Sequence, residues 1–181
     1  MNPDTHNNHD LADTPEVKQG SPQVSIRPIE TGDDAAVANI VRTVLAEFGC
    51  SGEGFACADP ELPQMSSHYP GGSARFFVLA RGDELVGCGG FSRLSGADPD
   101  TCELQKMYFR PAIRGQGIGR RFLAFLLAQI RQAGYHRVYL ETIQEMQAAR
   151  HLYGAFGFRP LESHLGATGH HRCDCPYLLE L

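Results

Sequence analysis

The sequence predicts a mixed α/β fold in one domain, and two observations support this prediction. The chain has 181 residues, of which 42% are apolar and 20% charged, proportions that are typical of a globular domain with one core. The apolar residues recur with strand and helix periods in the order strand, helix, loop, three strands, helix, strand, helix, strand, strand. This order indicates an antiparallel beginning followed by one strand-helix-strand crossover.

The first residues differ from the rest of the chain. Residues 1–22 are polar, show no apolar period and end in Gln-Gly-Ser-Pro, so we expect a disordered N-terminal tail and one domain over residues 23–181. The tail lacks the apolar region of a secretory signal. The longest apolar run, residues 122–128, is far shorter than the ~20 residues of a membrane-spanning helix. We therefore expect a cytoplasmic protein that does not enter a membrane.

The first half of the predicted domain contains a strand, a helix and a long connection. Residues 24–29 predict a short strand, and residues 31–34 are suited to cap an amphipathic helix over residues 35–48. Residues 49–72 are rich in Gly, Pro, Ser and Asp, which predicts an irregular connection with one short helix near residues 60–67. Loops of this length are often functional.

A hairpin opens the second half. Residues 75–80 and 85–91 predict two strands around a tight turn at residues 81–84. Three glycines in the second strand suggest a bulge or a close backbone approach. The same periods predict a strand at 102–109, a glycine-rich loop at 114–120 leading into a helix that ends near 132, a strand at 136–142, a helix at 146–156, and final strands at 158–163 and 172–181.

Charge and cysteine content argue against several classes. The formal charge is −5 with a pI near 5.9 and no basic cluster stands out, so nucleic acid is not an expected partner. The six cysteines suit reduced thiols better than a disulfide framework. Residues 169–175 contain two histidines and two cysteines, and zinc binding is an alternative there. A structural zinc site usually draws a second ligand pair with CxxC-type spacing from elsewhere in the chain, whereas Cys173 and Cys175 fall on one predicted strand, so we expect no metal.

The glycine-rich loop suits an anionic ligand. A loop between a strand and a helix places free N–H groups and the positive end of the helix dipole at one point, which favours a phosphate or pyrophosphate. Gly115 and Gly117 permit a close approach, and Arg114 and Arg120 add positive charge. A Walker loop would end in Gly-Lys-Ser/Thr, and a dinucleotide fingerprint would have glycine in place of Arg120. Neither ATP nor NAD is favoured.

Three motifs follow one another along the second half of the chain. They are LQKMYFRP at 104–111, Arg114-Gly115-Gln116-Gly117-Ile118-Gly119, and Ala149 to Tyr153 followed by Gly157-Phe158. The second matches the Gln/Arg-x-x-Gly-x-Gly/Ala loop of the GNAT acyltransferases, and the others resemble the strand before that loop and the later helix. The resemblance covers about residues 24–181. It implies a mostly antiparallel sheet of six or seven strands flanked by helices, with two strands splayed at an acetyl-CoA site.

The resemblance implies an acetyl-CoA-dependent N-acetyltransferase in which an amine attacks the thioester directly in a ternary complex. The pyrophosphate would be bound by Arg114, Gly115, Gln116, Gly117, Ile118, Gly119 and Arg120. The backbone of Met107, Tyr108 and Phe109 would run beside the pantetheine arm. An amide near Met107 would polarise the acetyl carbonyl.

The resemblance also supplies catalytic candidates. Tyr153 matches the family tyrosine that protonates the leaving thiolate, and an unperturbed phenol, with a pKa of about 10, is protonated at neutral pH. Glu103 is the candidate general base, and its alternative is a strand glutamate that faces solvent or pairs with Lys106. Glu141, His170 or a water stay open as alternative bases. Met146 stands where many family members carry asparagine, so one side-chain contact to the coenzyme is expected to be absent.

The residues leave the acceptor open. A primary amine of a small molecule or peptide is the expected partner, and the net charge of −5 mildly favours a cationic one. A homodimer is an open alternative to a monomer. An acyl-CoA-binding regulator or sensor with little turnover is the alternative function. Tyr153 discriminates between the two, because a protein that only binds the coenzyme needs no proton donor there.

Overall fold

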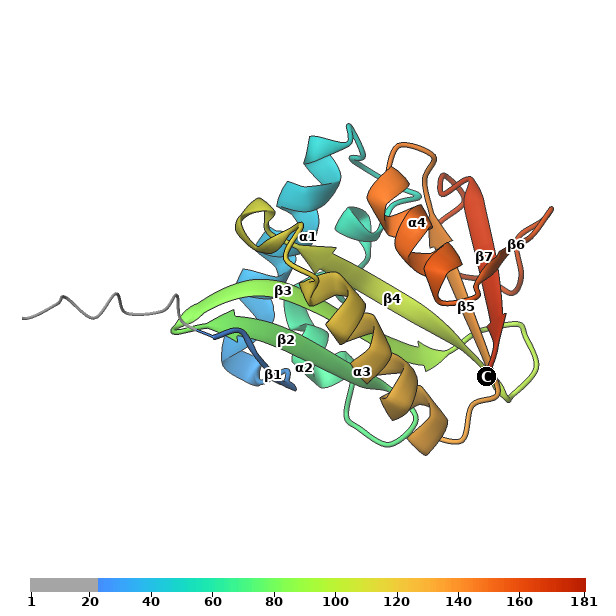
Figure 1. Cartoon of the computed structure of the whole chain (residues 1–181), viewed down its shortest axis with the longest axis horizontal. Helices are drawn as coiled ribbons and strands as arrows, with labels where there is room; N and C mark the ends of the chain where they lie inside the picture. The colour runs from blue at the N-terminus through green and yellow to red at the C-terminus, as the bar shows by residue number, and fades with distance from the viewer. Residues whose placement is uncertain (1–22) are drawn as a thin grey trace, which may run out of the picture.

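The computed structural model describes residues 23–181 as one sheet with helices on both faces (Figure 1). The predicted tail at residues 1–22 lies outside the described residues. Every predicted strand and helix overlaps an observed one. The strands are β1 (Ser25–Pro28), β2 (Arg75–Arg81), β3 (Glu84–Arg93), β4 (Thr101–Phe109), β5 (Arg137–Thr142), β6 (Arg159–Pro160) and β7 (Cys175–Glu180), and the helices are α1 (Asp34–Glu47), α2 (Met65–His68), α3 (Ile118–Gln132) and α4 (Gln147–Ala155).

The seven strands form one sheet in the order β1-β2-β3-β4-β5-β7-β6. All neighbours run antiparallel except β4 and β5, which are parallel. Helix α3 makes the crossover that a parallel pair requires. The predicted mostly antiparallel sheet of six or seven strands is confirmed.

Strands β4 and β5 separate toward their carboxyl ends (Figure 1). Their register joins residues 101–103 to residues 137–139, whereas β4 continues to Phe109 and β5 to Thr142. The predicted splay is therefore present, and it opens the middle of the sheet.

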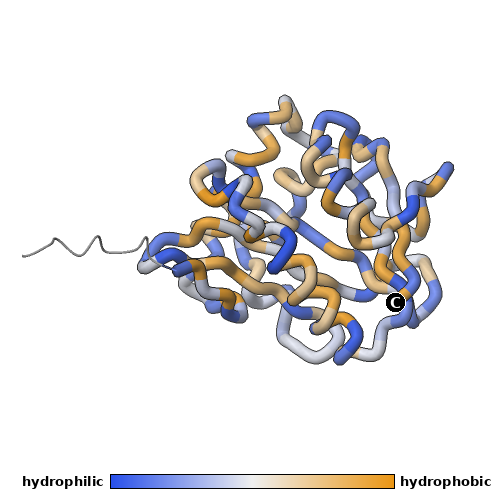
Figure 2. The backbone as a smooth tube through the Cα atoms, viewed as in Figure 1, coloured by the Kyte–Doolittle hydropathy of each residue, from blue (hydrophilic) through white to orange (hydrophobic). Residues whose placement is uncertain are grey.

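Two hydrophobic clusters cover the two faces of the sheet. Helix α1 buries Val37, Ile40 and Val41 against one face, together with Leu62 and Met65 from the 49–72 connection. Helix α3 buries apolar residues against the other face, where α4 also packs. Figure 2 shows the hydrophobic residues that run along the strands and helices around the sheet.

The glycines of β3 make room for a bulge in β4. Cys88 pairs with Tyr108 and Gly90 pairs with Gln105, so Gly89 faces two residues of β4, which is the pattern of a β-bulge. Lys106 at this bulge has a φ of 50°, the one positive φ of a non-glycine residue between 23 and 181. A Cβ on Gly90 would clash with the backbone oxygen of Arg75 in β2. Both suggested roles of these glycines, a bulge and a close approach, are confirmed.

The final strands are shorter than predicted. Strand β6 has two residues instead of 158–163, and β7 begins at Cys175 instead of 172. Pro160 has no N–H to extend a ladder, and a turn in which the Cys173 N–H donates to the His170 carbonyl (2.9 Å) precedes β7. Cys173 is therefore not on a strand, and the expectation that Cys173 and Cys175 lie on one strand is wrong.

Candidate active site

The opening between β4 and β5 contains a cavity of about 50 Å³. The bulged part of β4 forms one wall, and the end of β5 and helix α4 form the others. Its lining residues are Leu45, Leu104, Lys106, Met107, Tyr108, Glu141, Thr142, Ile143, Met146, Ala149, Tyr153 and Cys173. Because unpaired backbone and the bulge meet here, this cavity is the place where the sheet presents polar main-chain groups to a ligand.

Tyr153 projects from α4 to the wall of this cavity. Its side chain is buried, with 6% exposure, and packs beside Phe158 and Tyr177. Burial raises the pKa of the phenol, so the hydroxyl keeps its proton at neutral pH. The structure thus places the predicted acid at the opening of the sheet.

Glu103 lies on β4 and is 6% exposed. Its carboxylate accepts a hydrogen bond from Gln105 Nε2 (2.7 Å), and its Oε1 lies 3.8 Å from Nδ1 of His170. Burial raises the pKa of Glu103 to about 7, although His170, Gln105 and Lys106 oppose this shift. Glu103 therefore does not face solvent, because its side chain is buried. It does not pair with Lys106 either, because the Lys106 ammonium pairs with Asp59 and Glu61.

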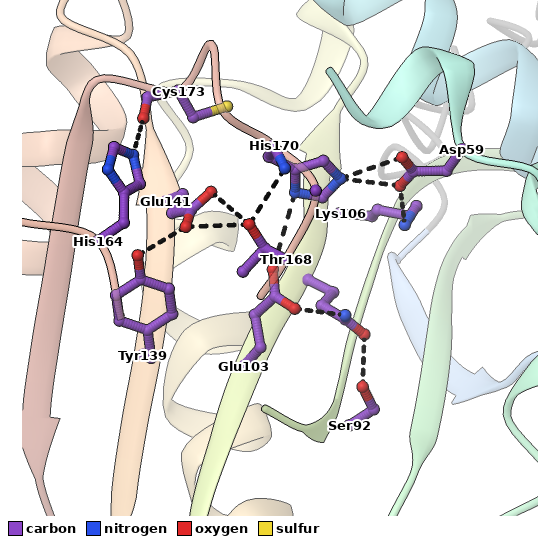
Figure 3. A network of polar contacts seen from close by, with 12 residues as sticks. Asp59, Ser92, Glu103, Lys106, Tyr139, Glu141, His164, Thr168, His170 and Cys173 are labelled. Atoms are coloured by element: carbon purple, nitrogen blue, oxygen red, sulfur yellow. Dashed lines mark hydrogen bonds and ion pairs between the residues drawn. The ribbon is translucent and has the colours of Figure 1, made fainter. Parts of the chain in front are cut away.

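A chain of charged side chains joins β4 to the long connection and to the segment before β7 (Figure 3). The Lys106 side chain is 1% exposed, and its ammonium lies 2.6 Å from Asp59 and 2.8 Å from Glu61. Asp59 also meets Nε2 of His170 at 3.0 and 3.1 Å. Burial alone would lower the pKa of Lys106, but the two carboxylates outweigh burial and raise it.

Glu141 on β5 belongs to the same polar face of the sheet. Its carboxylate accepts hydrogen bonds from the Tyr139 hydroxyl (2.6 Å) and from the Thr168 hydroxyl (2.9 Å), and Thr168 in turn accepts one from the His170 N–H (3.1 Å). Glu141 lines both the cavity described above and a more open pocket of about 290 Å³ formed by residues 164–171. The structure therefore brings Glu103, Glu141 and His170, the three predicted side-chain candidates for the base, into one network.

The glycine-rich loop lies at the N-terminus of α3. Gly115 and Gly117 have φ values of 72° and 74°, a conformation that favours glycine, and Gly117 is the N-cap of the helix. Arg114 already forms an ion pair with Glu47 of α1, with contacts of 2.6 and 3.1 Å. Arg120 lies over the ring of Phe156 at 5.3 Å. The loop therefore lies at a helix N-terminus, as the sequence predicts, and Arg114 has an intramolecular partner there.

The side chains of Met107 and Phe109 belong to the hydrophobic cluster under α3, whereas Tyr108 packs on the opposite face. Met107 and Tyr108 also line the cavity. Between residues 23 and 181, no group of three or more His, Cys, Asp or Glu is arranged to hold a metal ion. The residues of the zinc alternative do not converge on one point, because Cys173 packs with the hydrophobic cluster under α1, whereas the His170 ring faces Asp59.

Sequence reasoning missed several polar members of the network, among them Asp59, Glu61, Gln105 and Thr168. Asp59 lies in the connection at 49–72, whose length was the one signal available. Gln105 bridges Glu103 to the hydroxyl of Tyr69 (2.6 Å), again from that connection. The contacts with the 49–72 connection join segments far apart in the chain, so no local sequence pattern predicts them.

The structure combines an open central sheet, a glycine loop at a helix N-terminus, and a phenol and carboxylates near the opening. This combination is suited to acyl transfer. The chain matches the family model described as the acetyltransferase (GNAT) family over residues 45–158, and it belongs to this family. An uncharacterized N-acetyltransferase of Escherichia coli K12, YjgM, is 38% identical over 157 residues, which are 86% of this chain and 94% of that protein.

Solved structures share the fold. A GNAT acetyltransferase from Staphylococcus aureus Mu50 superposes with a TM-score of 0.76 at 19% identity, covering 87% of this chain and 99% of that one. The structure of yncA from Salmonella typhimurium with its cofactor acetyl-CoA has a TM-score of 0.67 at 19% identity and covers 87% and 94%. In the part of the chain that the structure describes, no helix is long and apolar enough to cross a membrane.

Proposed function

We propose that this protein transfers the acetyl group of acetyl-CoA to a primary amine of a small molecule or peptide, by direct attack in a ternary complex. The observation that carries the proposal is Glu103, a buried carboxylic acid in the last residue pair before β4 and β5 separate, with a pKa of about 7. A general base works best when its pKa lies near the working pH. Family membership supports the acyl-transfer chemistry, and the acetyl-CoA bound by the Salmonella protein supports the donor.

The coenzyme supplies an acetyl thioester, and two parts of the chain are suited to hold it. The N–H groups of the loop at Gly115 and Gly117 and the N-terminus of α3 suit its diphosphate. The β4 backbone at the bulge, next to Met107, suits its acyl end, because a main-chain N–H there stabilises the negative charge that develops on the carbonyl oxygen.

Three proton movements complete the reaction. Glu103 takes a proton from the acceptor ammonium, directly or through water, and thereby frees the amine lone pair for attack. As the C–S bond breaks and the C–N bond forms, Tyr153 gives its phenolic proton to the sulfur. The nitrogen loses a second proton as it becomes an amide, and this proton returns to the Tyr153 phenolate, directly or through water. The raised pKa of Tyr153 keeps that proton in place until the thiolate forms. Glu141 holds the hydroxyl of Thr168 in this scheme and takes no proton.

The charge around the opening favours a cationic acceptor. Carboxylates of Asp59, Glu61, Glu103 and Glu141 lie in one network, and Lys106 and His170 provide the positive charges within it. An excess of acidic groups attracts an ammonium group and fits an amine that arrives protonated. A cationic primary amine is therefore the acceptor class that we propose.

The test is release of free coenzyme thiol from acetyl-CoA in the presence of amines, amino acids, polyamines and peptides, corrected for the protein's own cysteines. Turnover with a cationic amine is the expected result. Tight binding of acetyl-CoA with no turnover on any amine would contradict the proposal and favour the regulator or sensor. Glu103→Gln then tests the base, because it keeps the shape and hydrogen bonding of the side chain and removes its ability to take a proton.

A further inference from the structure

His170 is held between two carboxylates that come from different parts of the chain (Figure 3). Its Nε2 lies 3.0 and 3.1 Å from the two oxygens of Asp59, and its Nδ1 lies 3.8 Å from Oε1 of Glu103. The side chain is 12% exposed, so water does little to screen these charges. An imidazole with a carboxylate at each ring nitrogen is suited to carry a positive charge.

Asp59 fixes which nitrogen faces the candidate base. A carboxylate accepts hydrogen bonds, so Nε2 of His170 donates to Asp59, and Nδ1 is the nitrogen that faces Glu103. The main chain of His170 is anchored as well, because its N–H donates to the Thr168 hydroxyl. A carboxylate that orients an imidazole in this way also stabilises its protonated form.

We propose that His170 is a positioning residue for the reaction: Asp59 orients its imidazole, and the imidazolium so held keeps Glu103 in the ionised form that accepts the acceptor's proton. This inference rests on the proposed function. His170 touches neither substrate nor coenzyme in this role and acts through Glu103 alone.

The other charges near His170 are consistent with this role. Facing the ring are Asp59 from the long connection and Glu103 and Lys106 from β4, with Glu141 of β5 behind Thr168. Burial alone would lower the pKa of His170, but the hydrogen bond and charge of Asp59 and the charge of Glu103 outweigh burial and Lys106, and raise it. For Glu103, burial is the larger cause and His170 is the first group that opposes it.

The pH dependence of kcat/KM tests the proposal in His170→Gln, in which a neutral amide keeps a donor for Asp59. Without the imidazolium, the acidic limb of the profile is expected to move to higher pH by about one to three pH units, the effect of one opposite charge at this distance. Activity above the new limb is expected to approach that of the wild type. His136→Gln, the same change in an exposed residue just before β5, is the control and keeps the wild-type limb.

A limb that stays in place, or moves to lower pH, overturns the proposal. A loss of turnover at every pH also overturns it, because that result makes His170 the base itself. Full activity of Glu103→Gln would instead remove Glu103 as the base, and with it the proposed mechanism. The two failures are therefore distinguishable.

A second measurement does not depend on turnover or on the His170 variant. The imidazole of His170 is titrated by NMR in the wild-type protein and in Glu103→Gln. Coupling between two sites is reciprocal, so the loss of the Glu103 charge is expected to lower the pKa of His170. An unchanged pKa in Glu103→Gln would overturn the proposal.

Discussion

Glu103 is expected to make the folded protein less stable as the pH rises, and Glu103→Gln is expected to remove this effect. Burial raises the pKa of Glu103 from 4.5 to about 7. Between these values the unfolded chain loses the proton while the folded protein retains it, so stability falls as the pH increases through this window. Above the pKa of Glu103 in the folded protein, the loss of stability has reached its full size.

The size of the effect follows from the displacement of the pKa. One pKa unit corresponds to about 1.4 kcal/mol, so a carboxyl group moved from 4.5 to about 7 costs roughly 3 kcal/mol of folding free energy at alkaline pH. The neutral amide introduced by Glu103→Gln resembles the protonated acid and has no such cost. The stability of Glu103→Gln relative to the wild type is expected to increase by about 2 to 3 kcal/mol between about pH 5 and about pH 8.

Urea denaturation of both proteins at the two pH values measures this difference. The same variant is expected to lose about 10²- to 10⁴-fold in turnover, the usual contribution of a general base. A variant that is more stable and nearly inactive would identify Glu103 as a group retained for function. If the stability difference does not grow with pH, the carboxylate is not held at a cost and the argument for its role as base fails.

Three further changes test other parts of the site. Tyr153→Phe keeps the buried ring, so coenzyme affinity by calorimetry is expected to stay constant while turnover by thiol release falls about 10²-fold; unchanged turnover would rule out the phenol as the acid. Glu47→Gln removes the ion pair of Arg114. It is expected to tighten coenzyme A binding by up to about fivefold, since an exposed pair contributes up to about 1 kcal/mol. Equal or weaker affinity would show that Arg114 does not reach the ligand. Gly117→Ala is expected to lower the free energy of unfolding by about 1 kcal/mol because of its positive φ. Gly154→Ala is the control, because Gly154 lies within α4 with open space where a Cβ would go. This change should stabilise the protein by up to about 1 kcal/mol. Equal effects of Gly117→Ala and Gly154→Ala in thermal unfolding would show that the positive φ of Gly117 does not account for the loss.

The fold could be predicted from the sequence where the signal is local. The period of Phe122, Leu126 and Ile130 marks the buried face of α3, and these residues are fully buried. The glycines of β3 indicated a bulge or close contact, and the register shows both. Such patterns depend on residues a few positions apart, which is the range over which periodicity and turn chemistry act.

The parts that escaped prediction depend on contacts between distant residues. Lys106 adopts a positive φ without being glycine, and its carboxylate partners lie in the 49–72 connection. Asp59 and His170 are 111 positions apart. No local pattern links Asp59 to His170, because the requirement for these charges arises only when the two segments pack against β4. The candidate base was visible in the sequence, but the contacts that set its charge were not.

The short pairing between β4 and β5 has a mechanical consequence. Hydrogen bonds join β1 through β4 on one side of the sheet and β5, β7 and β6 on the other, while residues 101–103 and 137–139 connect the two sides at one end. The sheet therefore has a weak joint in its middle, and the two sides are expected to open at a lower free energy than either side unfolds. A ligand that occupies the gap and contacts both sides adds its binding free energy to that joint. Coenzyme binding should then slow amide exchange in β7, a strand with no residue in the glycine loop.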